Sequence, residues 1–128
     1  MSTILVVDDL VALAEQYAYD LKRIGGHDVS VVTSGAPAVE RLRSEALDCV
    51  LLDLEMPGMD GFEVLRALKQ RGVETPVIVY TGTGNFDRCI EAVRLGAAGF
   101  IDKAEPMERV AQEVEHVIER QRLRLEVF

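Results

Sequence analysis

The chain has 128 residues, a length that suits one domain with a single hydrophobic core. Its residues are 48% hydrophobic and 28% charged, proportions that are typical of a soluble globular protein. The formal net charge of -8 argues against a nucleic-acid-binding or anionic-membrane surface. It favours instead a bound cation or a partner with a basic face.

The sequence contains no run of roughly 18 uncharged apolar residues, which a membrane-spanning helix would need. Its first residues also lack the basic and apolar regions of a signal peptide. The two cysteines, Cys49 and Cys89, each lie in an apolar pattern and are expected to be buried, reduced thiols in a cytoplasmic protein. We expect His27 and His116 to be ordinary surface residues.

Short apolar runs rich in Val, Ile and Leu recur along the chain. They are near-continuous rather than alternating, which is typical of strands buried on both faces of a parallel sheet. The predicted strands are 3–7, 29–32, 49–53, 76–81 and 99–102.

Segments with helical spacing separate these strands. The predicted helices are 10–24, 36–46, 61–71, 86–95 and a last helix that begins at Pro106. The first helix is expected to bury the stripe Leu10, Leu13, Ala14, Tyr17, Leu21 and Ile24. The fourth is expected to bury Phe86, Ile90 and Val93. Strict alternation of strand and helix predicts an α/β fold, a doubly wound parallel sheet with helices on both faces.

The alternating pattern leaves no room for a second domain. We assign residues 1–120 to one domain. Residues 121–128 are either the end of the last helix or the start of a linker to an effector domain.

Polar residues follow the predicted strands where their carboxyl ends meet, the edge at which open parallel sheets bind ligands. These residues are Asp8, Asp9, Asp53, Thr81, Asp102 and Lys103. Adjacent carboxylates repel one another unless a cation joins them, and oxygen ligands favour Mg²⁺. By these residues alone, Asp53 could be a metal ligand, a nucleophile that forms an acyl phosphate, or both in succession.

The same edge offers partners for a phosphoryl group. Thr81 could donate a hydrogen bond to it, and Lys103 could neutralise its charge. The segment "TGTGN" at 81–85 would let backbone N–H groups approach an anion. Each feature alone has a plainer explanation as a solvated turn or a helix cap. Their agreement at the ends of four strands favours the functional interpretation.

Four stretches of the chain carry a resemblance to a known family. They are "ILVVDD", "DCVLLDLEMPGMDGFEVL", "PVIVYTG" and "GAAGFIDK". In this order and spacing the sequence resembles the receiver domains of two-component response regulators, over about residues 3–120. The resemblance implies a flavodoxin-like (βα)5 fold with the strand order 2-1-3-4-5.

The resemblance also implies the roles of the acidic residues. Asp53 would accept a phosphoryl group from a phosphohistidine. Asp9 and Asp53 would bind Mg²⁺ directly, and Asp8 would act largely through water. The backbone carbonyl of Glu55 would complete the metal shell.

Further implied roles concern the bound phosphoryl group and the switch. The backbone at Glu55 and Gly82 would contact the phosphoryl group, Lys103 would neutralise it, and Thr81 would swing toward it. Phe100 matches the aromatic residue that moves inward together with the threonine. The signal would be read from the face formed by helix 86–95, strand 99–102 and the last helix.

The chain departs from the family pattern at two positions. Ala104 stands where members commonly have proline after the lysine, often with a cis bond. Because a cis bond before a non-proline residue costs roughly 2.5–4 kcal/mol, we predict a trans Lys103–Ala104 bond. Glu55 occupies a variable position that is tied to phosphoryl lifetime, so its carboxylate leaves the dephosphorylation rate open.

The implied partners are a sensor histidine kinase or phosphotransfer protein, and a second copy bound through the same output face. No nucleic-acid or membrane contact is expected of this domain, and it is not expected to be an enzyme beyond assisting its own phosphorylation and dephosphorylation.

Two alternatives remain at this point. One is a Mg²⁺-dependent phosphohydrolase with an aspartate nucleophile, faintly suggested by "DLE" at 53–55. The other is a degenerate interaction module that takes no phosphate.

Overall fold

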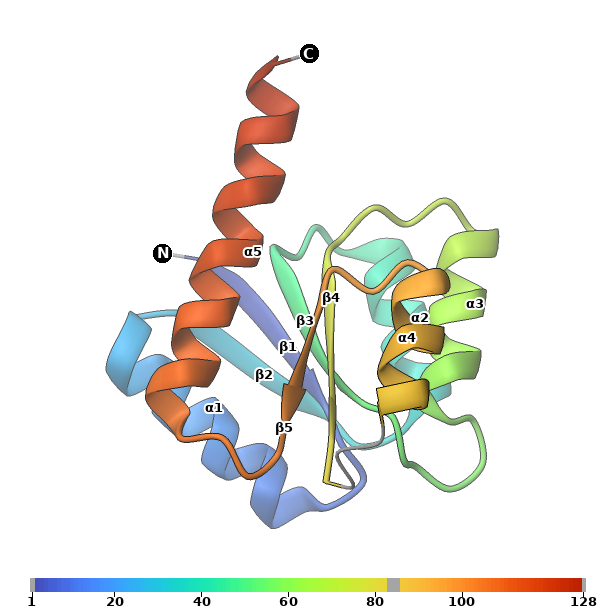
Figure 1. The fold of residues 1–128 in the computed structure, drawn as a ribbon, viewed down its shortest axis with the longest axis horizontal. Coiled ribbons are helices and arrows are strands. Elements are labelled where there is room, and N and C mark those ends of the chain that lie inside the picture. Colours follow the sequence, from blue (N-terminus) through green and yellow to red (C-terminus); the bar gives the residue numbers. More distant parts are fainter. Residues whose placement is uncertain (1, 83–85, 128) are drawn as a thin grey trace.

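The computed structural model describes residues 2–82 and 86–127 and contains one parallel sheet (Figure 1). Its strands are β1 (Thr3–Val7), β2 (Asp28–Val32), β3 (Cys49–Asp53), β4 (Val77–Thr81) and β5 (Gly99–Asp102). They lie in the order β2-β1-β3-β4-β5 and pair in parallel throughout. The doubly wound sheet and its strand order are therefore confirmed.

The helices alternate with the strands along the chain. They are α1 (Val11–Gly25), α2 (Gly35–Ser44), α3 (Gly61–Gln70), α4 (Phe86–Arg94) and α5 (Met107–Val127). In Figure 1, α1 and α5 cover one face of the sheet, and α2, α3 and α4 cover the other. The α5 helix extends beyond the sheet toward the C-terminus.

The hydrophobic core consists of two layers, one on each face of the sheet. Within β1, Leu5 and Val7 pack into the layer beneath α2, α3 and α4, whereas Ile4 and Val6 pack into the layer beneath α1 and α5. Successive side chains of a strand point to opposite faces, so a strand between two layers must be apolar at nearly every position. Every residue of β3 and of β4 is buried in this way.

The two edge strands depart from the predicted burial on both faces. In β2 only Val29 is buried, and in β5 only Ile101. Phe100 of β5 is 49% exposed. An edge strand has one neighbour and incomplete helical cover, so its apolar residues remain partly accessible to solvent.

The predicted stripe of α1 is correct in its middle and wrong at its ends. Ala14, Tyr17 and Leu21 are buried, but Leu10 and Ile24 are exposed. The helix begins at Val11 and ends at Gly25, and the next residue, Gly26, has a φ of 67°, the left-handed conformation that favours glycine. Leu10 and Ile24 thus lie at the helix ends, where the sheet no longer covers them.

The predicted buried face of α4 is wrong. Cys89 and Ala92 are the buried residues, whereas Ile90 and Val93 are 37% and 50% exposed. These two small side chains form a narrow buried face, so most of the helix surface stays accessible to solvent. The predicted contact of Phe86 falls on a side chain outside the described part of the structure.

The prediction for the two cysteines is confirmed, whereas the prediction for His27 is wrong. Cys49 and Cys89 are buried free thiols, as predicted. His116 is exposed, but His27 is buried, and its Nε2 lies 2.7 Å from Oε1 of Glu115 on α5. The turn after α1 folds the imidazole against Gly25, where an added Cβ would lie 2.5 Å from the ring. Among the described residues, no helix is long and apolar enough to cross a membrane.

Candidate functional site

Three aspartates meet at the carboxyl edge of the sheet. Asp8 directly follows β1, and Asp53 is the last residue of β3. Both are fully buried, while Asp9 is half-buried. Carboxylate oxygens of Asp8, Asp9 and Asp53 all lie within 4.8 Å of one another. The prediction that these acids converge is correct, because parallel strands β1 and β3 are neighbours in register.

The position of Asp53 depends on close packing by the segment that follows it. The Leu54 N–H donates to the carbonyl of Tyr80, which continues the pairing of β3 with β4. A Cβ added to Gly61 would lie 2.7 Å from the Asp53 carbonyl oxygen, so only glycine lets α3 begin this close to the strand. Asp60 caps α3 in a capping box with Glu63, which fixes where the helix starts.

The Asp53 carboxylate has one engaged oxygen and one without a protein partner. Oδ1 accepts the Glu55 N–H at 3.0 Å and lies 3.3 Å from Lys103 Nζ. Oδ2 is buried and has no hydrogen-bond partner among the described residues. Burial raises the pKa of Asp53 from its usual 3.8 to about 6, and the nearby charge of Asp8 adds to this rise. The Glu55 N–H and the Lys103 ammonium lower the pKa and only partly offset the effect.

The donor set fits a hard divalent cation. It consists of carboxylate oxygens alone, which suits Mg²⁺ better than a metal that prefers nitrogen or sulfur. The buried Oδ2 of Asp53 lacks the partner that buried polar atoms ordinarily have. A cation held by Asp8, Asp9 and Asp53 would supply that partner and offset the repulsion among the three acids.

Thr81 is the last residue of β4, the neighbour of β3, and Lys103 directly follows β5, which pairs with β4. Thr81 is 2% exposed, and its hydroxyl donates to Oε1 of Glu55 at 2.9 Å. The Lys103 N–H donates to the Thr81 carbonyl at 3.0 Å, so the loop after β5 is tied to β4. The side chain of Glu55 therefore contacts the hydroxyl that the sequence predicted to contact a phosphoryl group.

The Lys103–Ala104 bond is trans, as predicted, and the described chain contains no cis peptide bond. The Ala104 N–H donates to Oδ1 of Asp102 at 2.8 Å, and the Glu105 N–H donates to the Asp102 carbonyl at 2.9 Å. Asp102 thus stabilises the turn that presents Lys103, a task that the sequence did not assign to it.

Gly82 and Phe100 are the other predicted site residues that the structure describes. Gly82 is exposed at the rim, where an added Cβ would lie 3.5 Å from Cδ of Lys103. Phe100 lies on β5, half exposed, and borders a hollow between β5 and α5. The remainder of the "TGTGN" segment, at 83–85, lies outside the described residues.

Sequence reasoning missed Tyr80, which contacts the site from within β4. Its hydroxyl donates to Oδ2 of Asp8 at 2.6 Å. Burial raises the pKa of Tyr80 above its usual range, and the hydrogen bond to Asp8 raises it further. A signal was present in the strand "PVIVYT", because a tyrosine in a fully buried strand needs a hydrogen-bond partner for its hydroxyl.

Comparisons with known proteins agree with this geometry. The family model described as "Response regulator receiver domain" matches residues 4–115. The response regulator protein FleR of Pseudomonas aeruginosa is 39% identical over 100 residues, which cover 78% of this chain and 21% of that protein. The transcriptional regulatory protein FixJ of Bradyrhizobium diazoefficiens is 30% identical over 115 residues, which cover 90% of this chain and 56% of that protein.

Two solved structures show the same fold. The signal receiver domain of a LuxO repressor protein from Vibrio parahaemolyticus superposes with a TM-score of 0.91 at 28% identity, covering 98% of this chain and 96% of that chain. NtrX from Brucella abortus gives a TM-score of 0.91 at 31% identity, covering 98% of this chain but 29% of that chain. The chain thus spans between about a fifth and somewhat over half of the longer regulators named here.

Proposed function

Because the chain belongs to the family of response regulator receiver domains, we propose that it relays a signal by accepting a phosphoryl group on Asp53. The observation that carries this proposal is the Asp53 carboxylate, which is buried beside Asp8 and Asp9 and lies 3.3 Å from Lys103 Nζ. Within the described residues, the three-acid group that includes Asp53 is the one such group whose ligand atoms converge.

The reaction is a phosphoryl transfer from a phosphohistidine to a carboxylate. A carboxylate oxygen of Asp53 forms the new O–P bond as the N–P bond to the donor imidazole breaks, and the electron pair of that bond stays on the imidazole. Lys103 Nζ lies where it can neutralise the added charge, as charge-assisted contacts do in phosphoryl sites. Although burial raises the pKa of Asp53 to about 6, this value still lies below neutral pH, so the carboxyl is largely ionised and can act as a nucleophile.

We assign Asp8, Asp9 and Asp53 to a Mg²⁺ site, with the Glu55 carbonyl as a further ligand. When bound there, Mg²⁺ would stabilise the negative charge on the oxygens of the phosphoryl group. The chain's own part is to hold the carboxylates together and to bury Asp8 and Asp53 away from bulk water.

The switch in this proposal begins at Thr81. Its hydroxyl donates to Glu55 in the unphosphorylated chain, so a phosphoryl group on Asp53 would compete with Glu55 for that hydrogen bond. In the same proposal, the backbone at Glu55 and Gly82 contacts the phosphoryl group. Movement of Thr81 would alter β4 and free space for Phe100, whose ring is half exposed on β5.

The decisive experiment measures the intact mass of the chain after incubation with acetyl phosphate and Mg²⁺. The parent should gain one phosphoryl group, and Asp53→Asn should gain none, because the amide is not a nucleophile. Asp28→Asn makes the same chemical change at the exposed start of β2 and should behave like the parent.

A phosphoryl mass on Asp53→Asn would contradict the proposal. Steady turnover of a phosphomonoester by the parent would favour a phosphohydrolase instead. A parent that takes up no phosphoryl group would favour a module that acts by binding alone.

The partners in this proposal are a histidine kinase or phosphotransfer protein and an effector domain. Support for the effector comes from the regulators FleR and NtrX, of which the chain matches 21% and 29% of the length. The α5 helix runs to Val127, so residues 121–127 continue the last helix toward such a domain. A cytoplasmic location fits the two free thiols.

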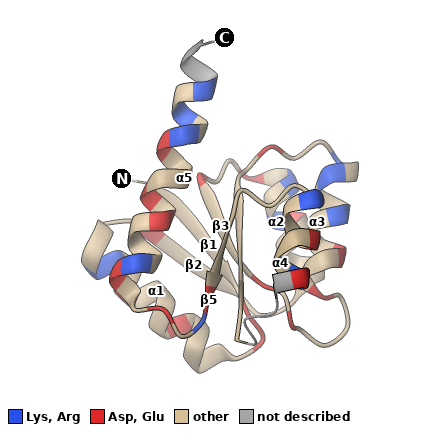
Figure 2. Ribbon diagram, viewed as in Figure 1, with Lys and Arg blue, Asp and Glu red and all other residues tan. Residues whose placement is uncertain are grey.

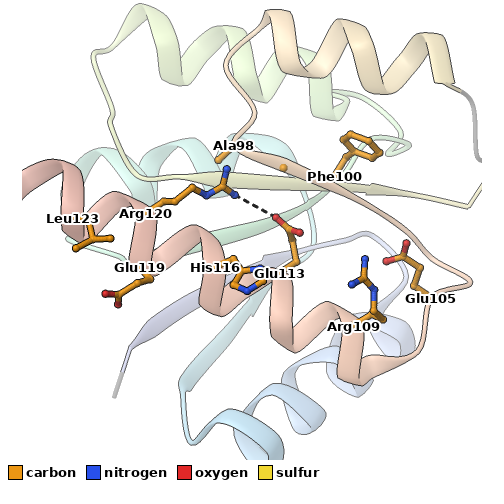
Figure 3. A pocket seen from close by; sticks show the side chains of 10 residues that line it. Ala98, Phe100, Glu105, Arg109, Glu113, His116, Glu119, Arg120 and Leu123 are labelled. Atoms are coloured by element: carbon orange, nitrogen blue, oxygen red, sulfur yellow. Dashed lines mark hydrogen bonds and ion pairs between the residues drawn. The ribbon is translucent and has the colours of Figure 1, made fainter.

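A second copy of the chain is a further partner, bound through α4, β5 and α5. A hollow of about 740 Å³ lies between β5 and α5, and Figure 3 shows charged side chains of both signs around it. They are Glu105, Arg109, Glu113, Glu119 and Arg120. Half-exposed Phe100 and Leu123 border the same hollow. A surface that carries both signs and exposed apolar groups can complement itself across a two-fold axis.

A further inference from the structure

Tyr80 lies next to the acidic site, and its hydroxyl contacts Asp8. It is the largest fully buried side chain among the described residues, and it projects from β4 into the layer beneath α1 and α5. Its position at the strand end, opposite Asp53 in the register of β3 and β4, brings its hydroxyl to Asp8.

Both oxygens of Asp8 are held by the chain. Oδ1 accepts the Leu10 N–H at 3.0 Å, and Oδ2 accepts the Tyr80 hydroxyl at 2.6 Å. Asp8 is fully buried, so no solvent-exposed rotamer competes with this orientation. Two hydrogen bonds at opposite oxygens fix the plane of the carboxylate, and with it the direction in which its remaining lone pairs point.

The Tyr80 ring is held in turn by its neighbours. The Tyr17 ring lies 5.1 Å away between centroids, tilted by 60°. Lys103 Nζ lies 5.3 Å from the Tyr80 ring centroid and 3.3 Å from Oδ1 of Asp53. The ring could therefore act as simple core packing, which phenylalanine would supply equally well, or its hydroxyl could have a task of its own.

We propose that Tyr80 is a positioning residue for the cation site, orienting Asp8 through the hydrogen bond from its hydroxyl. The proposal rests on the cation site of the proposed function. A group that hydrogen-bonds a metal ligand fixes the geometry of that ligand, and removing such a group ordinarily costs 10- to 100-fold in metal affinity. The chemical task belongs to the hydroxyl, whereas the ring serves packing.

The test compares Tyr80→Phe with Tyr17→Phe. Both remove one phenolic hydroxyl from a buried ring of the same cluster, but only the Tyr80 hydroxyl contacts Asp8. Mg²⁺ affinity is measured by titration, following backbone amide resonances of Asp9 and Leu54. Tyr80→Phe should bind Mg²⁺ about tenfold more weakly than the parent. Tyr17→Phe should bind within about twofold of the parent, because it leaves the Asp8 contacts intact.

A second readout separates positioning from a general loss of structure. The rate of phosphorylation by acetyl phosphate is measured against Mg²⁺ concentration. In Tyr80→Phe the half-saturating Mg²⁺ concentration should rise about tenfold, while the rate at saturating Mg²⁺ stays within about threefold of the parent. A lower limiting rate with unchanged half-saturation would overturn the proposal, and so would equal Mg²⁺ affinity in Tyr80→Phe and parent.

The parent chain supplies a measurement that needs no variant. The buried, hydrogen-bonded Tyr80 hydroxyl proton should exchange slowly enough to give its own resonance. That resonance should shift with the same Mg²⁺ midpoint as the Asp9 amide, and a resonance that Mg²⁺ leaves unmoved would overturn the proposal. A parent that binds no Mg²⁺ would remove the cation site itself, whereas a parent that binds Mg²⁺ as tightly as Tyr80→Phe would remove only the role of Tyr80.

Discussion

Asp9 and Asp53 have the same functional group but different surroundings, and the proposed function gives them different tasks. Asp53 is fully buried, and burial raises the pKa of its carboxyl to about 6. Asp9 is half-buried, so a hydrated cation can approach it from solvent. Mg²⁺ keeps several of its waters and is typically held by one or two carboxylates, so each protein ligand contributes much of the affinity.

Asp9→Ala should weaken Mg²⁺ binding more than any single change outside Asp53. We expect a loss of about tenfold or more, since one of few direct ligands is removed. The measurement is a Mg²⁺ titration followed by calorimetry or amide resonances. Glu15→Ala on α1 removes the same charge from an exposed position and is the matched control. Equal affinity in Asp9→Ala and parent would count against the ligand assignment.

At the scale of the element, the start of α3 decides where Asp53 lies. Gly61 allows the helix to begin against the Asp53 carbonyl and the Leu54 Cα, each 2.7 Å from the position of an added Cβ. The backbone cannot yield without moving the end of β3, because Leu54 is also hydrogen-bonded to Tyr80 of β4.

Gly61→Ala should therefore destabilise the fold by about 1–3 kcal/mol, the ordinary cost of overpacking. Chemical denaturation of parent and variant measures this change in the free energy of unfolding. Gly99→Ala is the control, because the nearest atom to its Cβ would be a carboxylate oxygen on the flexible side chain of Glu113, at 2.9 Å. A loss at Gly61 no larger than that at Gly99 would show that α3 can shift without strain.

The elements α4, β5 and α5 form the proposed contact between two copies of the chain. Figure 2 shows basic and acidic residues interspersed along α5. Exposed Ile90 and Val93 on α4 add apolar surface to this side of the molecule. Their exposure has a physical reason in the fold, since the buried face of α4 consists of the small residues Cys89 and Ala92.

Arg109→Glu should weaken any such dimer by placing another negative charge beside Glu105 and Glu113. Sedimentation velocity, with and without acetyl phosphate and Mg²⁺, measures the dimer fraction. Arg43→Glu makes the same charge change on exposed α2 and should dimerise like the parent. A parent that stays monomeric when phosphorylated, or an Arg109→Glu chain that dimerises like the parent, would contradict the proposed face.

At the scale of the whole molecule, the buried carboxyl of Asp53 links the stability of the fold to pH. An acid whose pKa is raised by folding binds protons more tightly in the folded state than in the unfolded chain. For Asp53 the window lies between its usual 3.8 and about 6, so stability falls as pH rises through this range. This rise in pKa corresponds to a loss of about 3 kcal/mol in the free energy of unfolding at neutral pH.

Asp53→Asn should accordingly be more stable than the parent at pH 7 in the presence of a chelator, by up to about 3 kcal/mol. The difference should shrink toward pH 4, where the parent carboxyl is protonated in the folded state. Adding Mg²⁺ at pH 7 should also reduce it, because a cation stabilises the charged form in the parent alone. Denaturation curves across this pH range provide the measurement, and a pH-independent difference would contradict the raised pKa.

Much of the architecture follows from local sequence. Continuous apolar runs between amphipathic segments predict a doubly wound sheet, because each strand needs apolar side chains on both faces. Acids at the ends of 3–7 and 49–53 predict a cation site, because parallel strands bring those ends to one edge. Positive-φ glycines such as Gly26 and Gly96 mark helix ends for a purely local reason.

Other features depend on neighbours that only the folded chain supplies. His27 is buried because α5, from the far end of the sequence, covers it and brings Glu115 to its ring. Ile90 is exposed because α4 packs through its small residues. The Tyr80 hydroxyl reaches Asp8 across 72 positions of sequence, since β4 and β1 both border β3. Periodicity determines which residues share a face of an element, but which face is covered, and by what, is decided by tertiary packing.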